Sequence, residues 1–424
     1  MPDTDPRVRL RTPAELIATL PYLLGYRLRD SLVVVAVDGG RLGLIQRFDL
    51  VVSGYGLPSR RAVDVARRML RREDPDAVMI VDCETSPGSG TPLRTAISRL
   101  CRRNGWEVMV EVVTRGERWW DVEAGDELAG PGRPLPDPQH VPAVAECVAA
   151  GLAPLPGRAA LTALFEPSAG ADDMRAPIDA ERRRRTSNAE PPLERYRLDA
   201  LAWRAWLADD PGHVARDDVF DHASRDAADH DSAHDPAHDP DHAQDRALGH
   251  ARPDAFDAGS GRGPASERAP VARASTGVAP LSPECLAICV VSLEDTDFRD
   301  ALIAWLAPGL LPPPTAPYDA YAVLTDVLGA VPQSGPRHRQ GRLEALRERG
   351  QNRLIDAIRA TPADDQVALL TVFGSITWWQ GDGARAGEAA HRARRLRPSY
   401  TLAVLLSEMI RQGIRFGSTS GRIG

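Results

Sequence analysis

The sequence predicts an α/β protein, with α+β as the alternative, in which a mixed β-sheet with flanking helices is followed by an all-helical C-terminal part. Three observations lead to this prediction. Valine-rich runs alternate with amphipathic helical segments up to about residue 135. Beyond that residue, apolar side chains recur at helical spacing. A segment rich in aspartate interrupts this helical part and has the composition of a disordered chain.

The N-terminal region, residues 8–135, carries the signals of a complete mixed-sheet domain. Thr12, Pro13 and Glu15 have the spacing of a capping box, which predicts a helix that ends at Gly25. The elements that follow are predicted in the order strand, strand, helix, strand, helix, strand and strand. Their expected ranges are 31–37, 42–50, 59–72, 77–82, 91–104, 107–114 and 118–122.

The rest of the folded chain is predicted to be helical, as an extension over residues 136–208 and a C-terminal domain over residues 281–414. Gly374, Ala386, Ala393 and Pro398 have the spacing of the small residues and the proline of a tetratricopeptide unit. Because a single unit of this kind is not stable by itself, we expect a structural hairpin that packs on the preceding helices. A peptide-binding groove is the alternative.

Residues 209–275 are predicted to form a disordered Asp/His/Pro-rich insert. Thirteen aspartates and only four arginines lie between Asp209 and Asp254, so this stretch alone has a formal charge of −9, against −7 for the whole chain. Four histidines repeat every four residues, which on a helix would form a Zn²⁺ or Ni²⁺ site. Prolines interrupt any such helix, so we expect at most weak, adventitious metal binding. These histidines are His230, His234, His238 and His242.

Composition excludes several classes of protein. The chain has no lysine, so all 52 basic residues are arginine and no Schiff-base lysine or phosphate-loop lysine is available. Five scattered cysteines argue against a disulfide framework and fit a reducing compartment. The charged start, residues 1–10, is unlike a signal peptide, and no apolar run is long enough to span a bilayer. We therefore expect a soluble cytoplasmic protein with no membrane association and no cofactor.

Acidic residues near strand ends suggest one catalytic alternative. Asp38, Asp49 and Asp82 lie at or near the ends of the first three predicted strands, and Glu111 lies within the fourth. If the sheet brought two or three of them to one rim, they would hold Mg²⁺ for phosphodiester hydrolysis. Aspartate after a strand is also ordinary turn chemistry, so these carboxylates are candidates only.

A second alternative is a small-ligand site formed by Asp30, Ser31, Arg47 and Asp49. Arg47 and Asp49 point to the same face of one strand, so they are able to pair with each other and fix the hairpin. Separately, the arginines at 182–185 have the charge to meet nucleic acid. Acidic residues flank them, so a solvated face is expected and a nucleic-acid partner is not.

Four segments resemble an actinobacterial family of uncharacterised proteins, known as domain of unknown function 4192. The resemblance extends over about residues 8–166 and 281–412, and it implies no activity. Its motifs are LPYLLGYRLRDSLVVVAV (20–37), RFDL (47–50), GLAPLPGRAALTALFEP (151–167) and FRDALIAWL (298–306). The aspartate-rich insert is a departure from the family pattern. We expect a non-catalytic protein that acts in regulation or by binding another protein.

Overall fold

The computed structural model describes residues 10–50, 59–126, 128–149, 151–188, 190–207, 282–311, 317–329 and 350–414. All of these residues belong to one compact unit. The predicted insert, with its four histidines, lies outside the described residues. The boundary between the sheet and the helical part stays a prediction.

The N-terminal part contains a six-stranded mixed sheet in the order β2-β1-β3-β4-β5-β6. Neighbouring strands are antiparallel except for β3 and β4, which are parallel and joined by a helix. This confirms the predicted mixed sheet. The strands are β1 (Ser31–Asp38), β2 (Arg41–Asp49), β3 (Ala77–Cys83), β4 (Glu107–Arg115), β5 (Arg118–Asp121) and β6 (Arg133–Pro134).

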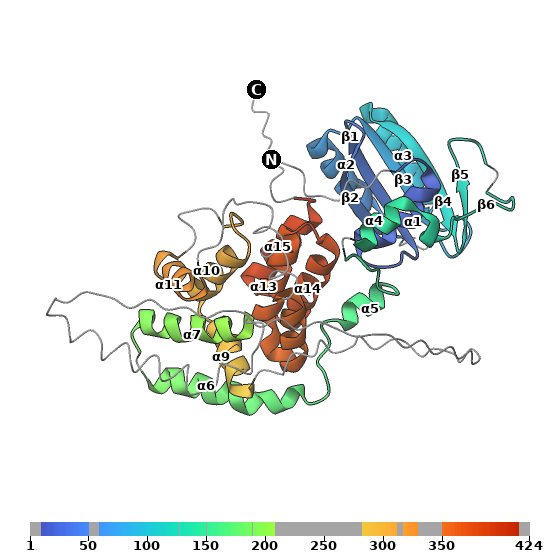
Figure 1. The fold of residues 1–424 in the computed structure, drawn as a ribbon. Helices are drawn as coiled ribbons and strands as arrows, with labels where there is room; N and C mark the ends of the chain where they lie inside the picture. Colours follow the sequence, from blue (N-terminus) through green and yellow to red (C-terminus); the bar gives the residue numbers. More distant parts are fainter. Residues whose placement is uncertain are drawn as a thin grey trace, which may run out of the picture. The chain divides into compact units, whose positions relative to one another are not determined.

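Helices cover both faces of this sheet (Figure 1). On one face, α2 (Arg60–Glu73) and α3 (Thr91–Asn104) bury the side chains that alternate strand residues direct toward them. On the other face, α1 (Pro13–Leu24) packs on the sheet and is itself covered by α4 (Pro142–Ala149). The seven buried residues of β1, 31–37, contact both layers, which explains their continuous valine-rich pattern.

The start of α1 has the expected cap with one difference. The hydroxyl of Thr12 accepts a hydrogen bond from the backbone N–H of Glu15 at 3.2 Å. The carboxylate of Glu15 accepts from the N–H of Arg11, at 2.8 Å, and not from Thr12 as a capping box requires. The helix ends as predicted at Gly25, which has a φ of 78°.

The remaining described residues are helical apart from their connections. The sequence predicts helices at 141–150, 157–165 and 193–207, which correspond to α4, α5 and α7. It does not predict α6, because the long charged run of that helix hides its apolar face. None of the described helices is both long and apolar enough to cross a bilayer. The elements are α5 (Arg158–Ala163), α6 (Arg175–Ser187), α7 (Pro192–Leu207), α9 (Pro283–Ser292), α10 (Thr296–Leu306), α11 (Tyr318–Leu328), helical residues 350–360, α13 (Gln366–Trp379), α14 (Gly383–Leu396) and α15 (Thr401–Arg411).

The last three helices pack side by side (Figure 1). Small residues permit this close approach: a β-carbon added at Gly374 of α13 would lie 2.7 Å from Cδ2 of Leu406 in α15. Ala386 and Ala393 of α14 are fully buried. Twelve residues of α13 are buried, so neighbouring helices cover it on all sides. The arrangement agrees with the predicted tetratricopeptide-like hairpin.

Candidate functional site

One end of the sheet gathers most of the polar residues that the sequence singles out. Ser31 at the start of β1 pairs with Asp49 of β2 and with Cys83 of β3. Because β1 is antiparallel to both neighbours, this end combines the start of β1 with the ends of β2, β3 and β4. Asp38 pairs with Arg41 at the opposite end of the sheet. The structure therefore separates Asp38 from the other candidates.

On the α1 face of this end, Arg47 is the centre of a polar cluster. Its Nε donates to Oγ of Ser31 at 2.8 Å, and its Nη2 lies 2.7 Å from Oδ1 of Asp49. The guanidinium also lies 5.8 Å from the ring centroid of the buried Tyr26. The guanidinium of Arg47 therefore contacts a hydroxyl, a carboxylate and an aromatic ring of the protein itself.

Arg158 of α5 extends this cluster toward the helical part. Its Nη1 donates to both carboxylate oxygens of Asp49, at 3.1 and 3.0 Å, and its Nε lies 3.7 Å from Oε2 of Glu388 in α14. The hydroxyl of Thr162 donates to Oε1 of Glu388 at 2.9 Å. Burial acts to raise the pKa of Asp49, but the guanidinium groups of Arg47 and Arg158 hold it below its usual value. The cluster ties the sheet to α5 and α14 through charged groups.

On the α3 face, a second cluster lies around Asp82, whose side chain is fully buried. Nε of Arg94 lies 3.3 Å from Oδ2 of Asp82, yet neither oxygen of this carboxyl accepts a hydrogen bond. Arg94 instead donates from Nη1 to Oε1 of Glu111 at 2.9 Å, and Ser98 donates to Oε2 of Glu111 at 2.8 Å. Burial, reinforced by the charge of Glu84, raises the pKa of Asp82 to about 7.

The loop between β3 and α3 closes over this cluster. Glu84 accepts hydrogen bonds from the backbone N–H groups of Gly88 and Gly90, each at 3.1 Å, and from Nε of Arg115 at 2.7 Å. Asp30 accepts from the N–H and the hydroxyl of Thr85, at 3.0 and 2.6 Å. These bonds lower the pKa of Asp30. Asp30 therefore fixes the loop and does not join Arg47 and Asp49 in a pocket.

The acidic candidates for metal-dependent hydrolysis do not come together. Asp49 and Asp82 lie at the same end of the sheet but on opposite faces, because Asp82 pairs with Leu32 and Asp49 with Ser31. Asp38 lies at the other end. Glu111 shares a face with Asp82, but Arg94 lies between them. Within the described ranges, no group of three or more His, Cys, Asp or Glu residues has a metal-binding arrangement.

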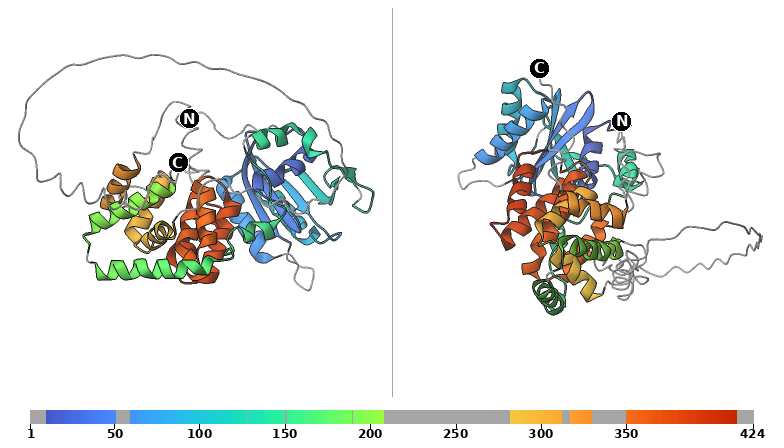
Figure 2. Two further views of the ribbon diagram at one scale, coloured as in Figure 1. Left: turned by 60° about the horizontal axis from the view of Figure 1, so that its bottom comes forward. Right: turned by 90° about the vertical axis from the view of Figure 1, so that its left-hand side faces the viewer.

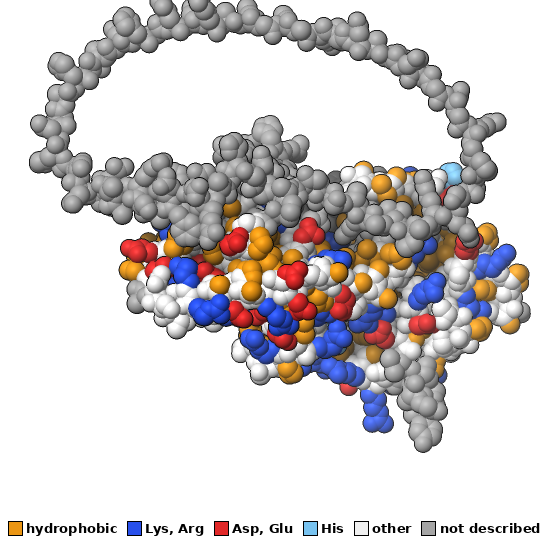
Figure 3. Space-filling view, turned by 90° about the horizontal axis from the view of Figure 1, so that it is seen from below, with side chains coloured by type: hydrophobic (Ala, Val, Ile, Leu, Met, Phe, Trp, Pro, Cys, Tyr) orange, Lys and Arg blue, Asp and Glu red, His pale blue; other side chains and the backbone are white. Residues whose placement is uncertain are grey.

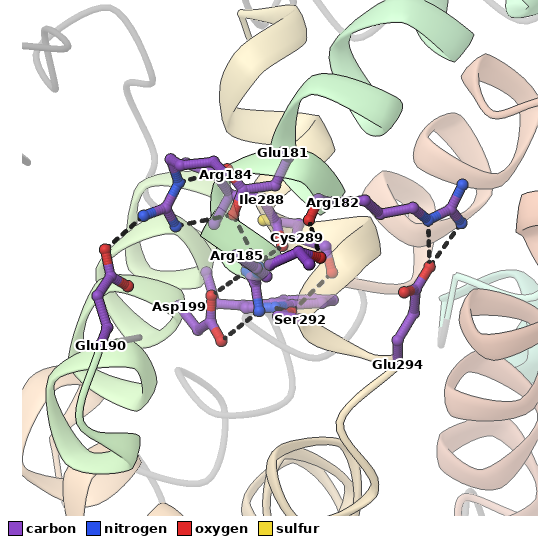
Figure 4. Close-up of polar contacts among 12 residues, drawn as sticks. Glu181, Arg182, Arg184, Arg185, Glu190, Asp199, Ile288, Cys289, Ser292 and Glu294 are labelled. Atoms are coloured by element: carbon purple, nitrogen blue, oxygen red, sulfur yellow. Dashed lines mark hydrogen bonds and ion pairs between the residues drawn. The ribbon is translucent and has the colours of Figure 1, made fainter. Parts of the chain in front are cut away.

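Three of the four arginines at 182–185 form ion pairs within the helical part (Figure 4). Arg185 binds the buried Asp199 of α7 through both terminal nitrogens, at 3.1 and 2.5 Å, and Glu181 through Nε at 2.7 Å. Burial raises the pKa of Asp199 to about 6 despite Arg185. The other ion pairs of this segment are Arg182 with Glu294 and Asp365, and Arg184 with Glu181 and Glu190. On the face of the molecule drawn in Figure 3, basic and acidic side chains are likewise interspersed.

A different kind of surface lies on α15. Val404 and Leu405 are 39% and 54% exposed, whereas the adjacent Ala403 and Leu406 are buried against the neighbouring helices. Val404 and Leu405 therefore leave apolar area on the outer side of α15.

Several residues of the sheet-end clusters were not identified from the sequence, among them Glu84, Arg94 and Arg115. The available signal was the run Gly88, Ser89, Gly90 between a buried strand and a helix. Such a run marks a place where backbone N–H groups are free to bind a carboxylate. Here that carboxylate belongs to the protein itself, as the bonds to Glu84 show.

No curated protein and no solved structure matches the chain. A family model described as "Domain of unknown function (DUF4192)" matches residues 13–335 and 341–415. The match includes the sheet, the helical part and the motifs that carry the resemblance. The chain therefore belongs to the DUF4192 family.

Proposed function

We propose that this protein is non-catalytic and acts by binding another protein through the outer face of α15. The observation that carries the proposal is the exposure of Val404 and Leu405 on a helix whose opposite face is locked against α13 and α14. A rigid helix with an apolar outer face fits a partner helix or groove. The charged groups at the sheet end support a structural role there, because their contacts are with one another.

We also propose a cytoplasmic location. All five cysteines are free thiols, and four of them are buried. Buried thiols without disulfides fit a reducing compartment.

The test is affinity purification from the native host with three forms of the full-length protein. The parent, Leu405→Asp and Leu193→Asp are compared by quantitative mass spectrometry. Leu193 on α7 is a matched control, because it is also 54% exposed. We expect a partner that the parent and the control capture equally, and that Leu405→Asp captures about tenfold less, which corresponds to about 1.4 kcal/mol.

Two results would contradict the proposal. The first is a set of captured proteins that is the same for all three forms. The second is hydrolysis of a model phosphodiester by the purified protein with Mg²⁺ or Mn²⁺, reduced by Asp82→Asn, which would favour the catalytic alternative.

A further inference from the structure

Helix α2 presents a row of arginines to solvent. Its apolar side chains Val65, Ala66, Met69 and Leu70 are buried against the sheet. Its opposite side carries six arginines together with Asp64, which pairs with Arg67 at 2.9 Å. Helix α3 packs beside α2 (Figure 2). It carries three further exposed arginines, of which Arg102 pairs with Glu123 at 2.7 Å. We call this surface the arginine stripe; it consists of Arg60, Arg61, Arg68, Arg71 and Arg72 of α2 with Arg99 and Arg103 of α3.

The two helices of the stripe run in the same direction. Strands β2 and β3 are both antiparallel to β1, and each is followed by a helix that returns to the start of the next strand. Consequently α2 and α3 are parallel, and their arginines form two adjacent rows. Residues 60 to 71 of α2 span roughly 17 Å along the helix axis at 1.5 Å per residue.

Three arginines of the stripe differ from three arginines of α6 in their partners. In α6, Arg182, Arg184 and Arg185 each bind at least one carboxylate. Among the described residues, Arg60, Arg61 and Arg71 bind none. Arg72 donates to the backbone oxygen of Gln412 at 2.7 Å. Hydrogen bonds from Arg411 and Gln412, with a smaller contribution from the charge of Arg68, lower the pKa of Glu408.

Helix stability does not account for the stripe. Arg71 and Arg72 suit the negative end of the α2 macrodipole, but Arg60 and Arg61 occupy the positive end, and no acidic residue lies in the first turn. Arg68 and Arg72 are four residues apart, a spacing at which like charges destabilise a helix by about 0.2–0.5 kcal/mol. An anionic partner would relieve this repulsion.

We propose that the arginine stripe binds an acidic polypeptide segment of a partner protein. Each guanidinium offers parallel N–H donors that match a carboxylate. Carboxylates one helical turn apart, about 5.4 Å, match the spacing of arginines along α2. The proposal rests on the proposed function in that the partner is a protein, but it concerns the arginines of α2 and α3 and not the apolar side chains of α15.

A protein partner is favoured over nucleic acid by one feature. The described residues of α2 and α3 include no aromatic side chain on which bases would stack.

The experiment measures fluorescence anisotropy of a labelled helical peptide with glutamates along one face, using the full-length protein. The test variant combines Arg60→Gln, Arg61→Gln and Arg71→Gln. The control variant removes the same number of exposed arginines elsewhere, as Arg183→Gln, Arg394→Gln and Arg395→Gln. We expect the test variant to raise the Kd at least tenfold and the control to leave it within about twofold, with equal melting temperatures for both.

Further results test whether the arginine stripe is the binding surface. Leu405→Asp should leave the Kd for the peptide unchanged, because Leu405 belongs to the outer face of α15. A failure of the α15 proposal would therefore be observed separately from a failure of this one. Absence of parent binding to the peptide, or equal weakening by both triple variants, would overturn the proposal. Tighter, stripe-dependent binding of a DNA duplex than of the peptide would also overturn it, in favour of nucleic acid.

Discussion

The carboxyl group of Asp82 lies directly against the backbone of Gly90: a β-carbon added at Gly90 would lie 1.9 Å from Oδ1 of Asp82. Gly90 is the N-cap of α3, and its N–H also donates to Glu84 at 3.1 Å. The end of β3 and the start of α3 are therefore packed without space for any side chain at this position.

Replacement of Gly90 by alanine should destabilise the protein by about 3 kcal/mol, the upper range for overpacking a rigid core. The φ of Gly90 is −85°, which alanine adopts freely, so the loss is steric. Urea unfolding measures it. Gly383→Ala in the first turn of α14 is the control, since a β-carbon there meets nothing within 4 Å. Equal stability of both variants would contradict the packing described here.

Asp82 should make the protein less stable as pH rises from about 4 to about 7. Burial and Glu84 raise the pKa of Asp82 from 3.8 to about 7, so the folded state retains this proton where the unfolded chain has lost it. At 1.36 kcal/mol per pH unit, the cumulative loss is about 4 kcal/mol, and it ends above pH 7. Asp82→Asn cannot ionise, so its stability relative to the parent should increase over this interval.

Urea unfolding of both proteins at pH 4, 5, 6, 7 and 8 measures this difference. Parallel stability profiles for the parent and Asp82→Asn would show that the carboxyl is not the group that titrates. Asp76→Asn is a suitable control, because Asp76 is exposed at the other end of the sheet.

The sheet and the terminal hairpin were predictable from sequence because local signals specify them. The cap at Thr12, the turn at Gly39 and the spacing of Gly374 from Ala386 each depend on nearby residues. Which distant side chains come together depends instead on the order of the strands and on the face of the sheet to which each side chain points. The ends of strands carrying Asp38 and Asp82 look alike in sequence, but the antiparallel pairing of β1 with β3 places them at opposite ends. The burial of Asp82 likewise depends on Gly90, a contact that no local pattern predicts.

Arg47→Ala should cost about 1–2 kcal/mol of stability. The substitution removes the ion pair with Asp49, the hydrogen bond to Ser31 and the contact with Tyr26. A fully buried pair would cost more, but the side chain of Asp49 is 51% exposed and keeps Arg158 as a partner. Urea unfolding is the measurement, with the exposed Arg27→Ala as control. Parent-like stability would indicate that Arg47 serves another purpose, such as ligand binding.

Arg185→Ala should be more damaging, by roughly 3–5 kcal/mol, because it leaves the buried carboxylate of Asp199 without its cation. Arg183→Ala, in the same turn of α6, should change stability by less than about 0.5 kcal/mol, since Arg183 is exposed. Thermal unfolding followed by circular dichroism compares the two. If the two variants melt together, the network in Figure 4 contributes little to stability.

The terminal helices should not fold as an isolated fragment of residues 363–424. Buried side chains surround α13 on all sides, and part of their cover comes from α9 and α10, which the fragment lacks. The face that α14 buries consists largely of alanines, such as Ala386 and Ala390, which allow close approach but remove little apolar area from water. Circular dichroism of the fragment should show weak helicity and a broad melt. A cooperative transition would instead identify an autonomous module, whose binding surface on α15 would then be testable apart from the rest of the chain.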